Sequence, residues 1–215
     1  MSDIPEFSDL PAQAPGQSQA NSFWDIWDTP SEPDVIEPLE NNPRDIGYAD
    51  ELSDFWRFQG NTNDCGLYSQ GGVLEADGQT FDIEKFRQQG MDGGWYTPQE
   101  GTYINHFGDL MEENGVEVTR YESASFQDMA NELDQGHGVV VAVDCLPLWG
   151  QWGGHALWVT GMEVGEDGTP VSVICNDSGR PDGQEIAYPY EDFKMAWESY
   201  GNVMVATQDK LASLS

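Results

Sequence analysis

Basic residues are scarce in this 215-residue sequence, and their scarcity argues against two classes of partner. Only 8 Lys and Arg residues stand against 39 Asp and Glu residues, which gives a formal net charge of -31 at pH 7. Proteins that bind nucleic acids or anionic membranes contact phosphates through Lys and Arg, so the sequence predicts neither partner. A basic partner or substrate would be attracted, although solubility or adaptation to a salty cytoplasm is the favoured explanation of the acidity.

Cysteine, histidine and long apolar runs are also sparse. The three cysteines, Cys65, Cys145 and Cys175, form neither a disulfide framework nor a C-x-x-C pair. Together with 3 His, they show no spacing typical of zinc ligands. No run of about 18 apolar residues is present to cross a membrane, and residues 1–7 lack the basic and apolar regions of a secretory signal. We therefore expect a cytoplasmic protein without a metal or cofactor, although unconventional export would leave no trace in the sequence.

Composition divides the chain into two regions. Residues 1–42 are rich in Pro, Ser, Gln, Asp and Glu, and residues 1–55 contain 13 acidic residues against one basic residue, Arg44. Such a segment buries too little apolar surface to fold, so we predict a disordered tail before a domain over residues 43–215. An aromatic island at 22–28, with the sequence SFWDIWD, interrupts the tail. Because exposed aromatic groups are costly, we expect this island to dock on the domain, with or without covering the cleft, or on a partner protein.

Helices precede strands in the predicted domain. Apolar periodicity and turn residues predict helices at 65–75, 83–89, 102–114, 125–133 and 190–200, and strands at 138–144, 156–162, 171–175 and 202–207. A turn at 165–168 should join the second and third strands into a hairpin. Either Ser125 or Ser123 should cap the fourth helix, and Gly71 and Gly72 indicate close packing of the first helix. This order predicts an α+β fold, with N-terminal helices packed on a mostly antiparallel sheet.

Cys65 carries the clearest chemical signal. Turn-forming residues at 60–64 precede it, and it opens the first predicted helix. The free N–H groups and partial positive charge of a helix N-terminus stabilise a thiolate, which is the nucleophilic form of cysteine. Gln59, six residues earlier, could donate a side-chain N–H to an oxyanion. The alternative for Cys65 is a buried structural cysteine, and we expect Cys145 and Cys175, at strand ends, to be ordinary apolar packing.

A nucleophilic cysteine needs a base, and His155 is the best candidate. It lies where the loop Trp152-Gly-Gly meets a predicted strand, which would expose its imidazole on a rigid support. His106 falls inside a predicted helix, and His137 in a predicted turn. The base in turn needs an orienting partner. A hairpin would bring Asn176 or Asp177 next to His155, and strand alternation lets only one of the two point toward it.

These residues together resemble a known family. Gln59 with Cys65 in Asn-Asp-Cys-Gly, then Gly-His155-Ala-Leu-Trp-Val-Thr-Gly, then Asn176-Asp177-Ser-Gly, look like the double-glycine-type peptidases. These are papain-like cysteine peptidases that process bacteriocin leaders, together with their standalone bacterial relatives. The likeness covers about residues 45–207, and no transporter segment accompanies it in this sequence. The resemblance implies a papain-like fold, an oxyanion role for Gln59 and an orienting role for Asp177; Ser178 stands where the family usually has Pro.

The sequence therefore predicts a papain-like cysteine peptidase or amidohydrolase. Cys65, His155, Asp177 and Gln59 would form its catalytic set, and its substrate would be a peptide or protein. The negative charge of the chain would attract a basic one. The first alternative is other thiol acyl chemistry on the same scaffold, such as deamidation, transglutamination or acyl transfer, as a secreted effector would use. These reactions differ in which substrate binds. The second is a noncatalytic peptide-binding module, against which the intact Gln, Cys, His and Asp set argues.

Overall fold

An antiparallel sheet is the centre of the part of the chain that this computed structural model describes, residues 34–37, 39 and 45–215. Six strands follow the order β4-β9-β5-β6-β7-β8, and β1 pairs with the far part of β6, beyond the end of β5. The strands of this sheet are β1 (Asp45–Gly47), β4 (Val118–Tyr121), β5 (Val139–Asp144), β6 (Gly154–Val164), β7 (Pro170–Asn176), β8 (Ile186–Pro189) and β9 (Met204–Thr207).

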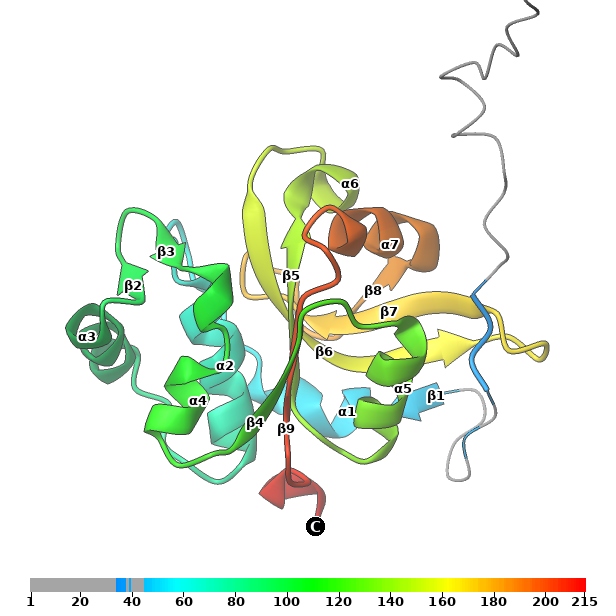
Figure 1. The fold of residues 1–215 in the computed structure, drawn as a ribbon, viewed down its shortest axis with the longest axis horizontal. Helices are drawn as coiled ribbons and strands as arrows, with labels where there is room; N and C mark the ends of the chain where they lie inside the picture. The colour runs from blue at the N-terminus through cyan, green and yellow to red at the C-terminus, as the bar shows by residue number, and fades with distance from the viewer. Residues whose placement is uncertain (1–33, 38, 40–44) are drawn as a thin grey trace, which may run out of the picture. The chain divides into compact units, whose positions relative to one another are not determined.

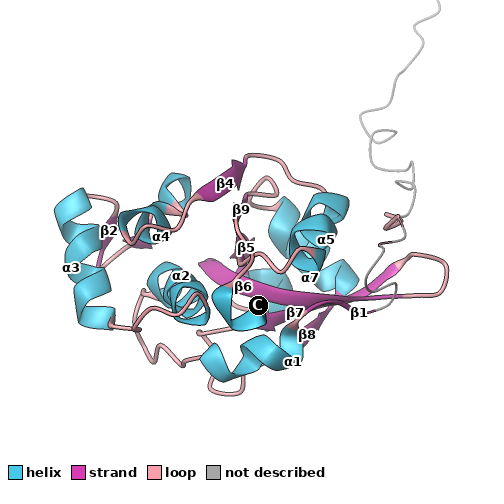
Figure 2. Cartoon of the chain, turned by 90° about the horizontal axis from the view of Figure 1, so that it is seen from below, coloured by secondary structure: helices cyan, strands magenta, loops and turns pink. Residues whose placement is uncertain are grey.

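Helices cover both faces of this sheet. In Figure 1 and Figure 2, α2, α3 and α4 gather on one side of the sheet, and α5 and α7 on the other. The helices are α1 (Ala49–Leu52), α2 (Cys65–Ala76), α3 (Ile83–Gly93), α4 (Asp109–Glu113), α5 (Phe126–Asp134), α6 (Cys145–Trp149) and α7 (Tyr190–Glu198), with short 3-10 turns η1 (Ser53–Phe55), η2 (Ile104–His106) and η3 (Ala212–Leu214). A two-stranded ribbon, formed by β2 (Tyr96–Thr97) and β3 (Gly101–Thr102), follows α3 in the sequence.

Alternation along the strands separates two hydrophobic cores. Val139, Val141 and Val143 of β5 belong to the core that α5 and α7 complete, whereas Val140 and Ala142 belong to the core around α2 and α4. Successive side chains of a strand point to opposite faces, so a sheet that is covered on both sides must be apolar at every position. This requirement explains the unbroken run of Val and Ala in β5.

The predicted α+β fold is confirmed, as is the β6–β7 hairpin. The close packing predicted for the two glycines of α2 is confirmed as well. A Cβ atom on Gly72 would lie 2.8 Å from the Trp158 ring, and one on Gly71 would lie 2.7 Å from the Phe81 ring. The absence of a side chain at Gly72 brings α2 close to the sheet, and its absence at Gly71 brings α2 close to Phe81 and Phe86. Cys65 is the first residue of α2.

The single helix predicted over 102–114 is wrong. The segment consists of β3, η2 and the short helix α4, and Gly108 separates η2 from α4 with a φ of 102°. That left-handed conformation breaks a helix, and the backbone N–H of Gly108 donates to the Gln70 side chain. The helix predicted to end at Gly90 continues instead to Gly93, because Gly90 is buried within it and Gly94 forms its left-handed C-cap.

Part of the predicted tail contacts the domain. Ile36 is buried, its backbone N–H donates to the Gly168 carbonyl at 2.9 Å, and Lys194 pairs with Asp34 at 2.6 Å. The aromatic island at 22–28 and the remainder of the predicted tail up to residue 33 lie outside the described residues. Within the described part of the chain, no helix combines the length and apolar character needed to span a membrane.

The N-terminus of α5 provides a test of the local sequence signals. Ser125, not Ser123, is the N-cap: its hydroxyl accepts from the Asp128 N–H, and the Asp128 carboxylate accepts from the Ser125 N–H. We expect Ser125→Ala to lower the free energy of unfolding by about 1 kcal/mol, because α5 loses this capping box. Ser123→Ala is the matched control and should leave stability unchanged in urea denaturation. Equal effects of the two substitutions would contradict the assignment.

Candidate active site

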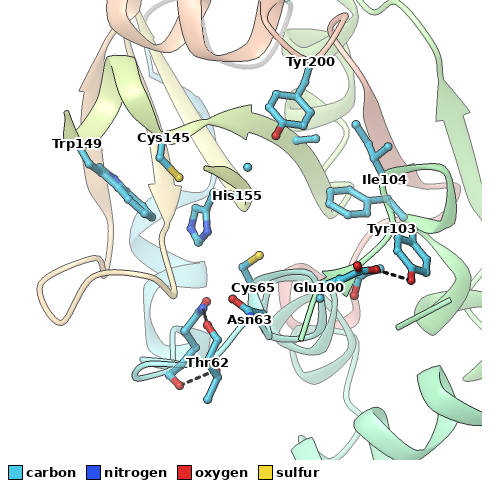
Figure 3. Close-up of a pocket in the computed structure, with 16 residues that line it drawn as sticks. Thr62, Asn63, Cys65, Glu100, Tyr103, Ile104, Cys145, Trp149, His155 and Tyr200 are labelled. Carbon is cyan, nitrogen blue, oxygen red and sulfur yellow. Dashed lines mark hydrogen bonds between the residues drawn. The ribbon is translucent and has the colours of Figure 1, made fainter. Parts of the chain in front are cut away.

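Cys65 lies in a cavity of about 460 Å³ between α2 and the sheet. Figure 3 shows its sulfur pointing into the space between His155, on β6, and the segment that carries Glu100 and Tyr103. Cys65 is the first residue of α2. The next residue, Gly66, packs closely against Thr102, because a Cβ on Gly66 would lie 2.7 Å from the Thr102 Cβ. The thiol is therefore held at a helix N-terminus on a helix that packs against the sheet.

His155 enters the same cavity from the start of β6. Its Nε2 atom lies 2.8 Å from Oδ1 of Asp177, just beyond the end of β7, so the hairpin brings the two side chains together. Because Nε2 is engaged by the carboxylate, Nδ1 is the ring nitrogen left to interact with Cys65. Trp149 of α6 packs on the imidazole, with ring centroids 4.5 Å apart. These contacts hold the ring in one orientation.

The Asp177 carboxylate is fully buried and receives several hydrogen bonds. Oδ1 also accepts from the Gly179 N–H at 2.8 Å, and Oδ2 accepts from the Tyr188 hydroxyl. The indole N–H of Trp149 donates to that same hydroxyl at 2.9 Å. Gly179 has no room for a side chain, since its Cβ would lie 2.6 Å from Trp149 and 2.9 Å from His155. A connected network therefore fixes the carboxylate that faces His155.

The electrostatics of the site favour an ion pair between Cys65 and His155. Burial works to raise the pKa of the Cys65 thiol, but hydrogen bonding and charge attraction from His155 outweigh it, so this pKa lies below its ordinary value. Burial likewise works to lower the pKa of His155, yet its hydrogen bonds with Asp177 and Cys65 raise that pKa to about 9. At neutral pH this arrangement can supply a thiolate nucleophile next to a proton donor.

Gln59 lines the cavity with Cys65 and is held at both ends of its amide. Its Oε1 accepts from the Ser178 hydroxyl at 2.7 Å, and its Nε2 donates to the Thr62 carbonyl at 2.7 Å. Its backbone N–H also donates to the Ser178 carbonyl at 2.9 Å. One amide hydrogen of Nε2 is used by Thr62, which leaves the second for another acceptor. Ser178, where the resembled family usually has Pro, thus anchors Gln59 to the segment that follows β7.

The structure separates the candidates that the sequence left open. Asp177 contacts His155, whereas Asn176 points elsewhere: its amide donates to the Leu52 carbonyl and accepts from the Glu185 N–H. His106 pairs with Asp109, and His137 pairs with Glu132. Neither histidine lines the cavity around Cys65.

The other two cysteines differ from each other. Cys175 is fully buried in the core, as apolar packing requires, but Cys145 lines the cavity near His155. The expectation of simple packing therefore describes Cys145 incompletely. Among the described residues, no cluster of His, Cys, Asp and Glu side chains could hold a metal ion.

Three aromatic residues of the site were not found from the sequence. Trp149 and Tyr188 orient the His155–Asp177 pair, and Tyr200 lines the cavity next to Gly154, where a Cβ would lie 2.2 Å from its hydroxyl oxygen. Trp149 lies in α6, Tyr188 in β8 and Tyr200 in the turn after α7, so no local spacing connects them with Cys65. The pair Gly153-Gly154 before His155 was one usable signal, because a glycine that precedes a reactive residue often marks a close approach by another group.

Comparisons with known proteins agree with this geometry. Residues 55–205 match the model of the Peptidase_C39 like family, a range that includes the whole cavity. A crystal structure of a Bacillus anthracis protein assigned as a C39-like peptidase superposes with a TM-score of 0.59 at 16% identity, covering 79% of this chain and 100% of that chain. At this identity the likeness concerns the fold alone. None of the curated proteins matches the sequence.

The three thiols should differ sharply in reactivity. Burial raises the pKa of Cys145 to about 12 and that of Cys175 well above its ordinary value, whereas the pKa of Cys65 is lowered. We expect iodoacetamide at pH 7 to alkylate Cys65 at least about 100-fold faster than the other two, because the thiolate is the reacting species. Peptide mapping by mass spectrometry measures the three rates. Equal rates in the folded protein would remove the case for an activated thiol.

Proposed function

Since the chain belongs to the Peptidase_C39 like family, we propose that it hydrolyses a peptide or amide bond through Cys65, His155 and Asp177. Family membership supports a cysteine peptidase in general. The observation that carries the specific assignment is the buried contact between His155 Nε2 and Asp177 Oδ1, on an imidazole that lines the cavity with Cys65 and lowers the pKa of its thiol. A packed structural cysteine would have no need of an oriented imidazole.

In the proposed reaction, the Cys65 thiolate attacks the carbonyl carbon of the scissile bond. The imidazolium of His155 then gives its Nδ1 proton to the departing amine, which leaves a thioester on Cys65. His155, now neutral, takes a proton from a water molecule that attacks the thioester, and Cys65 departs as the free thiolate. Asp177 keeps the ring oriented and stabilises its positive charge during the first step. Each proton that His155 gives in acylation is recovered in deacylation.

Two donors are available for the negative oxygen of the tetrahedral intermediates. Gln59 has an amide hydrogen beyond the one used by Thr62, and Cys65 lies at a helix N-terminus with free backbone N–H groups. We assign the oxyanion site to Gln59 Nε2 and the Cys65 backbone N–H. Fixed donors of this kind are worth about 10²–10³ in kcat. The anchoring of Gln59 by Ser178 and Thr62 supports this role, because a fixed amide does not need to reorganise during the reaction.

The substrate we propose is a basic peptide segment. Of the described residues, no Lys or Arg lines the cavity, and its one acidic side chain, Glu100, is exposed beside Tyr103. Tyr103, Ile104 and Phe107 add apolar walls. A Lys or Arg side chain would place its methylene stem against such walls and its charged head near the carboxylate. The tyrosine ring would add a cation–π contact.

The direct test is cleavage of a proteome-derived peptide library, read by mass spectrometry. The wild-type protein should generate new peptide ends and Cys65→Ala none. Asp177→Ala should lower kcat/KM by about 10²–10⁴-fold, because the imidazole loses its orientation. The upper pH limit of activity should also fall below about 9, since Asp177 supports the charged form of His155. Asn176→Ala is the matched control.

The outcomes of this test separate the alternatives. Asn176→Ala should reduce activity far less than Asp177→Ala, and a reversed order would mean that the orienting residue is misassigned. Peptides with converted Gln or Asn side chains, or with new acyl links, would favour deamidation or transfer by the same thiol. Binding without any chemical change in wild-type protein would favour a peptide-binding module.

The preference for basic peptides has its own test. Peptides with Lys next to the scissile bond should be cleaved faster than the same peptides with Glu, and Glu100→Gln should reduce this preference by about twofold to fivefold, in line with an exposed ion pair. Added salt should weaken the preference in the wild type, because screening acts on exposed charges. Glu122→Gln, an exposed residue outside the cavity, is the control. A preference that survives Glu100→Gln unchanged would exclude Glu100 as the determinant.

A further inference from the structure

A carboxylate stands directly before the candidate nucleophile, in a place where it should do harm. Asp64 is the N-cap residue of α2, and Cys65 is the first residue of the helix. An aspartate at this position normally accepts hydrogen bonds from the first N–H groups of the helix. It would then occupy donors that stabilise a thiolate or an oxyanion and place a negative charge near the sulfur, which disfavours a second negative charge.

The structure shows Asp64 turned away from this capping position. Its side chain makes no capping hydrogen bond to the described residues of α2, and its backbone φ and ψ of -92° and 10° depart from the extended conformation typical of an N-cap. The side chain is nevertheless almost completely buried, at 1% exposure. A buried carboxylate requires partners elsewhere.

Arg87 and Tyr96 provide those partners. Arg87, on α3, donates to Oδ2 of Asp64 from Nη2 at 2.5 Å and from Nε at 3.2 Å, and the Tyr96 hydroxyl, on β2, donates to Oδ1. A fourth residue, Glu84, holds the guanidinium from its other side at 2.6 Å. Tyr96 is itself fixed, because a Cβ on Gly90 of α3 would lie 2.6 Å from its Cβ. Both donors therefore stand on rigid supports outside the cavity.

We propose that Arg87 and Tyr96 are positioning residues that hold the Asp64 carboxylate off the start of α2, so that the N–H groups there remain free for Cys65 and the substrate. The inference rests on the proposed function of Cys65 as the nucleophile. In this arrangement the ion pair between Arg87 and Asp64, outside the cavity, keeps the negative charge of Asp64 away from the reacting sulfur. The cavity-lining residues include neither Asp64 nor Arg87 nor Tyr96.

The other charged and titratable groups near Asp64 and Cys65 do not hold the Asp64 carboxylate away from the helix. The groups that act on Cys65 are His155 of the sheet, with Asp177 behind it, Cys145 of α6, and Tyr200 in the turn after α7; Asp144 lies near the last two. The groups around Asp64, besides Arg87 and Tyr96, are Thr62 and Tyr68, and Glu84 binds the other side of Arg87. Burial works to raise the pKa of Asp64, but Arg87 and Tyr96 lower it on balance, so the carboxylate stays charged at neutral pH.

The test is a double-mutant cycle read on the Cys65 thiol, whose pKa is taken from the pH dependence of its alkylation. Arg87→Met should raise that pKa by about 1, because the released carboxylate then acts on the sulfur. Asp64→Asn alone should change it little, whereas Asp64→Asn in the Arg87→Met protein should bring it back toward the wild-type value. Such non-additivity is the signature of coupled residues. Arg120→Met, which removes a surface guanidinium paired with Asp109 and Glu112, is the control.

Tyr96→Phe provides a second, independent test of the same contact. Tyr96→Phe removes one hydroxyl without altering a charge, and it should shift the thiol pKa in the same direction by a smaller amount, even if Arg87→Met fails to fold. An unchanged thiol pKa in both Arg87→Met and Tyr96→Phe, or additive effects in the cycle, would overturn the proposal. The alkylation readout needs no peptidase activity. A shifted pKa in a protein that cleaves no peptide would therefore reject the proposed function and retain this inference.

Discussion

The buried Asp177 carboxylate is the constraint on which the site depends. Taking such a group out of water costs several kcal/mol unless donors replace its hydration, and here the donors are His155, the Gly179 backbone and Tyr188. The same residue also binds the Trp56 indole through its backbone carbonyl, at 2.8 Å. The hydrogen bonds to this one residue thus connect β6, β7, β8 and the segment that leads to Cys65. The orientation of His155 follows from this requirement.

The candidate site combines the thiol of a helix residue with the imidazole of a residue in the sheet on which that helix packs. Cys65 belongs to α2, which packs through Gly72 on Trp158 of β6, and His155 lies on the same strand three residues before that tryptophan. The distance between thiol and imidazole is therefore set by a helix-to-strand contact made without a side chain on the helix. On the helical side, Arg87 and Tyr96 bind the Asp64 carboxylate and hold its negative charge pointing away from the thiol.

Sequence reasoning succeeded where a local pattern determines the structure, and it failed where distant residues do. The start of α2 at Cys65, the β6–β7 hairpin and the Ser125 cap each follow from a few neighbouring residues. The segment 102–114 has helical periodicity, but Gly108 is held in a left-handed conformation by a bond to Gln70 that no local pattern reveals. Tyr188 and Trp149 reach the site from separate elements, so only the three-dimensional arrangement identifies them. Strand alternation showed that one of Asn176 and Asp177 faces His155 but could not say which, and the family resemblance chose between them.

The position of β9 in the sheet has a consequence for the order in which the protein can mature. Met204–Thr207 pairs with β4 on one side and β5 on the other, so a strand from late in the sequence fills an interior place in the sheet. During synthesis on the ribosome, residues before β9 emerge with a gap between these two partners, and Tyr200, which walls the cavity, also emerges late. Cys65 leaves the exit tunnel long before either. In a nascent chain that ends before Tyr200, β4 and β5 therefore lack their shared partner, and the cavity lacks the wall that Tyr200 supplies.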